Sequence, residues 1–256
     1  MAKENTVVRG IVLRSVDTKE TDKILTVLTA DRGKFPVVAK GARGRRSRVT
    51  AATQLLAYSE MVLSESRGWQ YLAEANTIEL FNGVRQDVEL LSLASYFAEL
   101  TEAVAVDGEE SGEILSLLLN ALYALGTLHR PPELVRAAFE LRLMALIGFA
   151  PLVDSCAYCG ADSPEEPVLD LQGGVIRCRK CGAGGRGVAL TPGALAAMRH
   201  VLYGDPKRLY SFTLGAEDQR RLSQAVESYV SAMLERSFRT LDFYKSLRLP
   251  EKSAKS

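Results

Sequence analysis

Over its first eighty residues, the chain alternates short β-branched runs with turn residues. The runs predict five strands over residues 6–15, 22–30, 35–40, 58–65 and 71–81. Five short strands in one compact segment are typical of a small closed barrel. An oligonucleotide-binding (OB) Greek-key barrel and an SH3-like barrel both fit this pattern, since periodicity alone does not separate them. We interpret residues 1–81 as an OB-fold domain.

After residue 81, apolar residues recur every three or four positions, which is the period of amphipathic helices. Helices are predicted over residues 84–106, 112–128, 132–147, 194–202 and 217–238. Pro131-Pro132 opens the third helix, and Gly148 with Pro151 ends it. We therefore expect a helical domain over 82–150, C-terminal helices over 191–249 that pack on it, and a flexible tail over 250–256.

All four cysteines lie in one window, as two CxxC pairs separated by eighteen residues: Cys156, Cys159, Cys178 and Cys181. Each pair brings two sulfurs to one side of a tight turn, so the set predicts one tetrahedral zinc ion in a module spanning 151–190. Four thiolates leave no open position on the metal, which indicates a structural role. The whole chain is thus predicted to be a multidomain α+β protein with a four-cysteine zinc-finger insertion.

Two disulfides or a redox CxxC are the alternatives to zinc. The N-terminus has no apolar signal segment, so we expect a reducing cytoplasm in which disulfides are rare. No apolar run reaches the roughly 18 residues that a membrane span needs. A redox pair would stand alone beside a βαβ pattern, which is not found.

The sequence offers no anchor for enzymatic chemistry. It contains no GxxxxGK[ST], GxSxG or HExxH motif. A zinc deaminase requires a glutamate two residues after its ligand histidine. Neither of the two histidines here, His129 and His200, is followed by one. We expect a protein that is not an enzyme and has no small-molecule substrate.

Charge is distributed unevenly along the chain although the net charge is only +1. Residues 1–50 carry twelve Lys and Arg against five Asp and Glu, whereas residues 81–128 carry one Arg against eight acids. The N-terminal part therefore suits a polyanionic partner, and the helical middle does not.

The densest positive charge lies in residues 40–48, between the third and fourth predicted strands. Two glycines there allow close backbone approach, and guanidinium groups bind phosphate in a forked geometry. We predict sequence-independent phosphate contacts, with a solvated basic loop as the alternative. The predicted contacts are Lys40, Arg43, Arg45, Arg46 and Arg48, helped by Lys34.

Trp69 is the only tryptophan and lies in the turn between the last two predicted strands, flanked by Arg67 and Tyr71. In OB barrels this loop borders the nucleic-acid face, so Trp69 and Arg67 are candidate DNA-binding residues. Alternatively, Trp69 covers the hairpin.

Motifs spread over nearly the whole chain resemble one family, the RecO recombination mediators. The similar segments are Gly10-Ile-Val-Leu-Arg14, Glu20-Thr-Asp-Lys-Ile-Leu25, Leu28-Thr-Ala-Asp-Arg-Gly-Lys34, Val38-Ala-Lys-Gly-Ala-Arg43, Phe139-Glu-Leu-Arg-Leu143, Gly148-Phe-Ala-Pro151 and Tyr244-Lys-Ser-Leu247. One departure is Gln54-Leu-Leu, where the family often has Gln-Pro-Phe. The departure concerns the entry to the fourth strand.

The resemblance implies an OB domain, a helical body and a zinc module without enzymatic turnover. It implies a bacterial cytoplasmic protein that binds single- and double-stranded DNA without sequence preference and anneals complementary strands. With the partner RecR, such proteins help RecA replace the single-strand-binding protein SSB on gapped DNA. The alternative is a zinc-ribbon transcription or RNA-binding factor; a metal nuclease is more distant.

SSB proteins generally end in an acidic tail with an apolar tip. Such a tail is expected to dock in an apolar groove with a basic rim. We predict this groove on the helical body beside Arg136, Arg142 or Lys245.

Overall fold

The computed structural model describes residues 5–45, 47–181 and 187–248 of the chain. It separates into two compact units, which we call unit 1 (residues 1–127 and 238–256) and unit 2 (residues 128–237). These units divide the chain differently from the domains expected above. The barrel shares unit 1 with the first helices and the last one, while the cysteine segment shares unit 2 with three helices. Arg46 and the tail over 250–256 lie outside the described residues.

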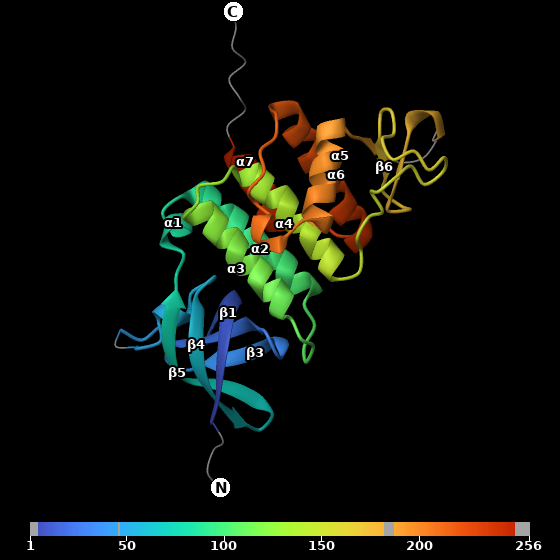
Figure 1. Ribbon diagram of the computed structural model, residues 1–256. Coiled ribbons are helices and arrows are strands. Elements are labelled where there is room, and N and C mark those ends of the chain that lie inside the picture. The colour runs from blue at the N-terminus through green and yellow to red at the C-terminus, as the bar shows by residue number, and fades with distance from the viewer. Residues whose placement is uncertain (1–4, 46, 182–186, 249–256) are drawn as a thin grey trace, which may run out of the picture. The chain divides into compact units, whose positions relative to one another are not determined.

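The N-terminal part of unit 1 is a closed five-stranded barrel (Figure 1). Its strands are β1 (Asn5–Thr18), β2 (Asp22–Thr29), β3 (Gly33–Ala39), β4 (Tyr58–Ser66) and β5 (Trp69–Glu79). Strands β1 to β3 pair consecutively, and β4 returns to pair with β1, which is the Greek-key order. Strand β5 closes the barrel between β3 and β4. This order confirms the OB fold.

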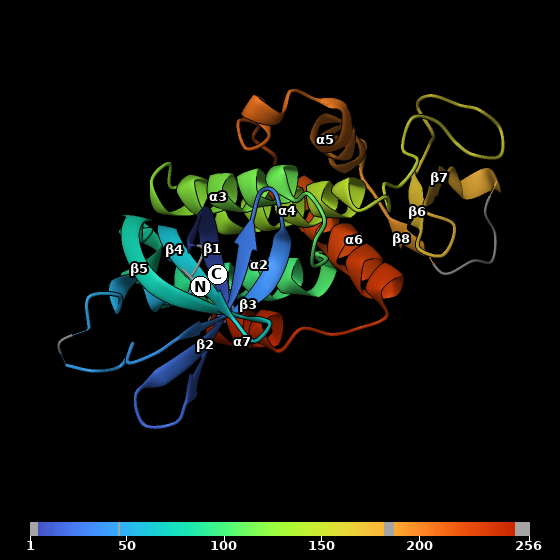
Figure 2. The ribbon, with the colours of Figure 1, turned by 90° about the horizontal axis from the view of Figure 1, so that it is seen from below.

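Alternation along the strands fills the barrel. In β2 and β3, every second side chain points inward and is fully or almost fully buried, as with Leu25, Val27, Phe35 and Val37. The β1–β2 hairpin and the segment that follows β3 extend outward from this closed core (Figure 2). The two extensions contact each other, since the backbone of the segment after β3 bonds to Thr21 and Asp22 at the β1–β2 turn.

Four helices complete unit 1: α1 (Asn82–Arg85), α2 (Val88–Val104), α3 (Gly112–Gly126) and α7 (Arg239–Leu247). Asp87 separates α1 from α2. Its carboxylate caps α2 by accepting hydrogen bonds from the backbone N–H groups of Glu89 and Leu90. Helix α7 packs along α2, where the rings of Tyr96 and Phe238 meet edge to face at 5.5 Å.

Unit 2 contains α4 (Pro132–Leu146), α5 (Pro192–Tyr203) and α6 (Ala216–Leu234), and α4 packs against both of the others. The predicted helix over 217–238 ends earlier, at Leu234, because Glu235 has a left-handed backbone (φ +49°). Short strands β6 (Val168–Asp170), β7 (Val175–Arg177) and β8 (Gly187–Ala189) form a small sheet beside the cysteines. Single 3-10 turns occur at Ala51–Thr53, Arg179–Cys181 and Pro206–Arg208.

Across the described ranges, no helix is both long enough and apolar enough to cross a membrane.

Candidate metal centre and nucleic-acid surface

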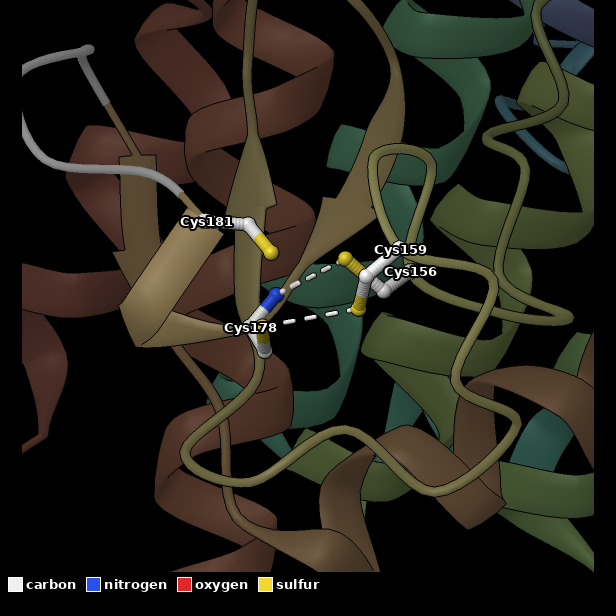
Figure 3. A group of neighbouring side chains, drawn as sticks. All are labelled: Cys156, Cys159, Cys178 and Cys181. Atoms are coloured by element: carbon white, nitrogen blue, oxygen red, sulfur yellow. Dashed lines mark hydrogen bonds between the residues drawn. The ribbon is translucent and has the colours of Figure 1, made fainter.

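The four cysteines converge at one point of unit 2, with their side chains pointing toward one another (Figure 3). All four sulfur atoms lie within 4.8 Å of one another, and the sulfurs of Cys159 and Cys178 are 3.9 Å apart. A tetrahedral ion with bonds of about 2.3 Å to sulfur separates its ligands by about 3.8 Å. The donor set therefore fits one tetrahedral metal ion with four thiolate ligands.

The backbone around the first CxxC pair forms the tight turn that such a site requires. Gly160 follows Cys159 with φ +72°, and its N–H donates to the carbonyl of Cys156 at 2.8 Å. The backbone N–H of Cys178 donates to the sulfur of Cys156 at 3.3 Å. Amide donors directed at sulfur stabilise a thiolate, so the turn prepares Cys156 for a positive ion.

The protonation of the thiols reflects the same geometry. Backbone N–H groups, that of Cys159 foremost, lower the pKa of Cys156 to about 6. The neighbouring sulfurs of Cys178 and Cys159 raise the pKa of Cys181 to about 12. Four thiolates so close together need a cation to offset their charge, so without a metal ion Cys181 keeps its proton.

Arg199 of α5 ties the first cysteine loop to the helices of unit 2. Its guanidinium donates to the backbone carbonyls of Val153, Asp154 and Asp162 at 2.7–2.8 Å. These carbonyls flank Cys156 and Cys159 on both sides. The cysteine module is thus attached to α5 by a side chain that the sequence motifs do not reveal.

In unit 1, the basic segment after β3 is anchored on the β1–β2 turn. The N–H of Gly41 donates to the Asp22 carboxylate at 2.8 Å, and the N–H of Arg43 donates to the carbonyl of Thr21 at 2.9 Å. The Arg43 guanidinium also lies 3.3 Å from the carboxylate of Asp17. Arg43 therefore holds the loop in place, and its charge is partly offset.

The other predicted phosphate contacts fall into three groups. Arg45 and Arg48 are exposed, and the Lys40 ammonium lies 4.7 Å from the centre of the Tyr71 ring. Arg46 lies outside the described residues. Lys34 is at the opposite end of β3, about 20 Å along the strand, and donates to the Glu102 carbonyl near the C-terminus of α2. The structure therefore places Lys34 apart from the loop that it was expected to help, because the end of a helix attracts a cation.

The β4–β5 connection is a two-residue hairpin turn. Ser66 pairs with Trp69, and both central residues, Arg67 and Gly68, have positive φ (+53° and +77°), as a type I′ turn requires. Arg67 is exposed, and 48% of Trp69 is accessible to solvent. Trp69 is thus exposed to solvent over nearly half of its surface and can contact a ligand.

Arg136 is not on the rim of an exposed groove, contrary to expectation. It is only 4% exposed and forms ion pairs with Glu133 (2.7 Å), Glu140 (3.1 Å) and Glu227 (3.1 Å). Burial alone would lower its pKa, but the carboxylates of Glu140 and Glu133 raise the pKa above its ordinary value. The spacing Glu133, Arg136, Glu140 on one helix is the signal that could have identified this cluster.

The other two residues of that prediction lie in different units. Arg142 of unit 2 is half-buried and donates to the Leu202 carbonyl at 2.9 Å. Lys245 of unit 1 is exposed on α7.

Sequence reasoning missed a groove in unit 1 between α2 and α7. It has a volume of about 340 Å³ and is lined by Val88, Leu91, Ser92, Ser95, Arg239, Thr240 and Phe243. Val88 and Phe243 are exposed apolar side chains, and Arg239 supplies a positive charge at its edge. The spacing of Arg239 and Phe243, four residues apart on a short helix, could have indicated it.

An OB barrel with an exposed basic loop, helices and a four-cysteine cluster defines a mixed α+β protein with a candidate nucleic-acid surface. The sequence models of two family domains match this chain: Recombination protein O N terminal over residues 1–81, and Recombination protein O C terminal over residues 85–242.

Curated relatives match along almost their full length. The DNA repair protein RecO of Acetivibrio thermocellus is 32% identical over 93% of this chain and 95% of the relative. The RecO protein of Symbiobacterium thermophilum is 34% identical over 94% of this chain and 97% of the relative. The RecO protein of Heliobacterium modesticaldum is 33% identical over 93% of this chain and 89% of the relative. The chain belongs to the RecO family of DNA repair proteins.

Proposed function

We propose that this protein is a recombination mediator that binds single- and double-stranded DNA without sequence preference and anneals complementary strands. With RecR, it would promote the loading of RecA onto gaps coated with SSB. The observation that carries the proposal is the exposed basic loop of the OB barrel, anchored at Gly41 and Arg43. Membership of the RecO family supports the same role in DNA repair.

The chemistry of the loop suits annealing. A protein that brings two like-charged strands together must offset phosphate charge without reading base edges. Arg45 and Arg48 expose guanidinium groups to solvent on a loop whose backbone is fixed at its start. Such cations bind any sequence, because phosphates are the same in every strand.

Removing three cations from the loop should weaken DNA binding for all sequences alike. In the variant Lys40→Gln, Arg45→Gln, Arg48→Gln, fewer counterions are released on binding. The slope of log K against log salt should therefore become shallower by about 0.7 for each phosphate that is no longer neutralised on a single strand. Fluorescence anisotropy with two unrelated oligonucleotides, each at several salt concentrations, measures both quantities.

The matched control removes three exposed cations from unit 2, in the variant Lys207→Gln, Arg208→Gln, Arg220→Gln. It changes the net charge equally and should leave the slope nearly unchanged. A large loss of affinity with an unaltered slope in the loop variant would show that the loop acts through folding and not through phosphate.

Annealing of complementary oligonucleotides, with and without SSB coating, tests the proposed function itself. We expect the protein to accelerate duplex formation in both cases. A zinc-ribbon transcription or RNA-binding factor would bind nucleic acid without accelerating annealing of SSB-coated strands, so that result would favour the alternative.

We further infer that the four cysteines hold one structural zinc ion and that the protein has no enzymatic turnover. The support for zinc is the all-thiolate donor set and the near-tetrahedral spacing of the sulfurs. Bound there, zinc would cross-link the two CxxC turns. Cys156, Cys159, Cys178 and Cys181 would fill every coordination position and leave none for a substrate.

For SSB, the proposed contact is the groove between α2 and α7 and not the surroundings of Arg136. The side chains of Val88 and Phe243 could cover an apolar tip, and Arg239 could attract an acidic tail. Arg136 is unsuitable because three carboxylates already offset its charge.

A further inference from the structure

The first half of β1 has one edge without a neighbouring strand. Residues Asn5–Arg9 pair with β4, but the pairing of β1 with β2 begins only at Gly10. Across the described ranges, no backbone hydrogen bond reaches the other edge of Asn5–Arg9, which we call the free edge. All of these residues are exposed except the half-buried Val8. About 17 Å of extended chain is thus open to another strand.

The backbone groups at the free edge belong to alternate residues. The N–H and C=O of Val12 both bond to the chain just before β4. Hydrogen-bonding residues alternate along an antiparallel strand, and the register with β4 runs from Asn5 to Ile11 without a shift. Every second residue before Val12 therefore also faces β4. The N–H and C=O groups of Asn5, Val7 and Arg9 point to the free edge.

No feature of the free edge opposes pairing with another strand. Exposed edges are usually guarded by charges, proline or bulges. The part of β5 after Tyr71 also lacks a second neighbouring strand, but it has bulges at Ala73 and Ile78 and carries two glutamates. The free edge has an unbroken register and contains neither proline nor lysine. Its one charge, Arg9, is offset by Glu60 at 3.0 Å.

The free edge is complementary to a second copy of itself. In an antiparallel pair about a twofold axis at Val7, this residue lies opposite the partner subunit's Val7, and Asn5 lies opposite the partner subunit's Arg9. The residues whose backbone groups point outward then face one another, so each can exchange two hydrogen bonds. Because Val7 is the midpoint of Asn5–Arg9, this register uses the whole free edge. It opposes no like charges.

The side chain of Val7 adds an apolar contact at the axis. Its neighbour Val8 packs on the barrel core, so Val7 points to the outer face, where it is 61% exposed. On that face it pairs across the strands with Val62 of β4. The axis brings two Val7 side chains together between two Val62 side chains. β-branched cross-strand neighbours of this kind stabilise a sheet.

We propose that two copies of this protein associate through the free edges of β1, which joins their barrels by one continuous antiparallel sheet. The contact is isologous, and it adds a strand to an exposed sheet edge. Each copy contributes only one short segment, so the interface is smaller than a standard one and the dimer is weak.

The basic loop takes no part in this pairing, because none of its residues belongs to the free edge. A dimer therefore carries two exposed basic loops. If the protein anneals DNA as proposed above, each barrel can hold one of the two strands. This consequence rests on the proposed function, whereas the pairing of the free edges does not.

Sedimentation velocity of the full-length protein, without DNA, tests the association. We expect a monomer–dimer equilibrium that shifts toward dimer as the concentration rises. Val7→Lys places two like charges side by side at the axis and should raise the dimer dissociation constant at least about tenfold. Ile78→Lys is the matched control, because Ile78 is another exposed β-branched residue of the barrel but lies on the guarded strand β5; it should change nothing. Circular dichroism verifies that both variants are folded.

Amide hydrogen exchange, followed residue by residue by NMR, locates the contact. The N–H groups of Thr6 and Val8 bond to β4 in monomer and dimer alike, whereas those of Val7 and Arg9 are bonded only in the dimer. Raising the protein concentration should therefore slow exchange at Val7 and Arg9 far more than at Thr6 and Val8.

Three results would overturn the proposal. The first is a protein that stays monomeric up to about 500 μM, well above the dissociation constants of weak specific interfaces; the free edge would then be left for a strand of another protein. The second is a dimer that Val7→Lys does not weaken. The third is a dimer in which the Val7 amide exchanges as fast as in the monomer. None of these results involves DNA, so each would leave the proposed function standing.

Discussion

Replacing Arg136 by methionine should lower the free energy of unfolding by about 3–5 kcal/mol, the usual cost of breaking a buried ion pair. Methionine has a similar length but cannot offset the charges of Glu133, Glu140 and Glu227, of which Glu140 is fully buried. Carboxylates held away from water need a nearby cation, and Arg136 supplies one to all three. Urea denaturation followed by circular dichroism measures the loss.

Arg221→Met is the matched control, because Arg221 pairs with Glu217 on the exposed side of α6. Water already screens that pair, so its loss should have little effect on unfolding. The double variant Arg136→Met, Glu140→Gln should regain part of the lost stability, since it contains one charge fewer. Because Glu227 lies on α6 and the other three residues lie on α4, the cluster also joins these two helices. An Arg136→Met protein as stable as the wild type would contradict this stabilising role.

Removing one thiolate ligand by Cys178→Ser should lower both the metal content and the melting temperature of the protein. Metal binding to structural zinc sites is worth on the order of 10–16 kcal/mol in model peptides at neutral pH, and this binding energy stabilises the folded state. Binding of DNA by the barrel should largely persist, since the barrel belongs to the other compact unit. Elemental analysis, thermal melting and anisotropy measure the three quantities.

Lys180→Ser is the control for this substitution, because Lys180 lies between Cys178 and Cys181 in the sequence but is exposed and pairs with Glu165. It should retain the metal. Wild-type protein purified without any metal, yet melting at the same temperature as metal-loaded protein, would contradict a structural role for the site.

Metal affinity should fall as the pH is lowered. A metal ion binds thiolates, and the raised pKa of Cys181, about 12, means that its proton must be displaced when the ion binds at neutral pH. The pKa of Cys156 is lowered to about 6, so the proton of this thiol competes with the metal only near or below that pH. Each displaced proton weakens apparent affinity about tenfold per pH unit. Titration with a chromogenic chelator between pH 6 and 8 measures the slope; a flat profile would contradict proton competition.

The four cysteines of the candidate metal site could be predicted from the sequence, whereas Arg199, which holds their loop, could not. The candidate DNA surface could be predicted only in part. The four cysteines sit in two CxxC pairs, and the turn at Gly160 that brings their sulfurs together is local. In the basic loop, the sequence shows how many cations there are but not what each one contacts. Arg43 pairs with Asp17, and Lys34 bonds to the end of α2; both partners lie far along the chain. Arg45 and Arg48, by contrast, are exposed to solvent.

The sequence by itself determined the strands of the barrel, most helices and the candidate metal ligands, because each follows from a pattern within a few residues. Only the tertiary structure decided the pairing of β1 with β4 and of β3 with β5, and with them the Greek-key order. It also decided the burial of Arg136 and the association of α7 with α2. Those contacts join segments widely separated in sequence. Their free energy comes from burying apolar surface and pairing charge, which no local period records.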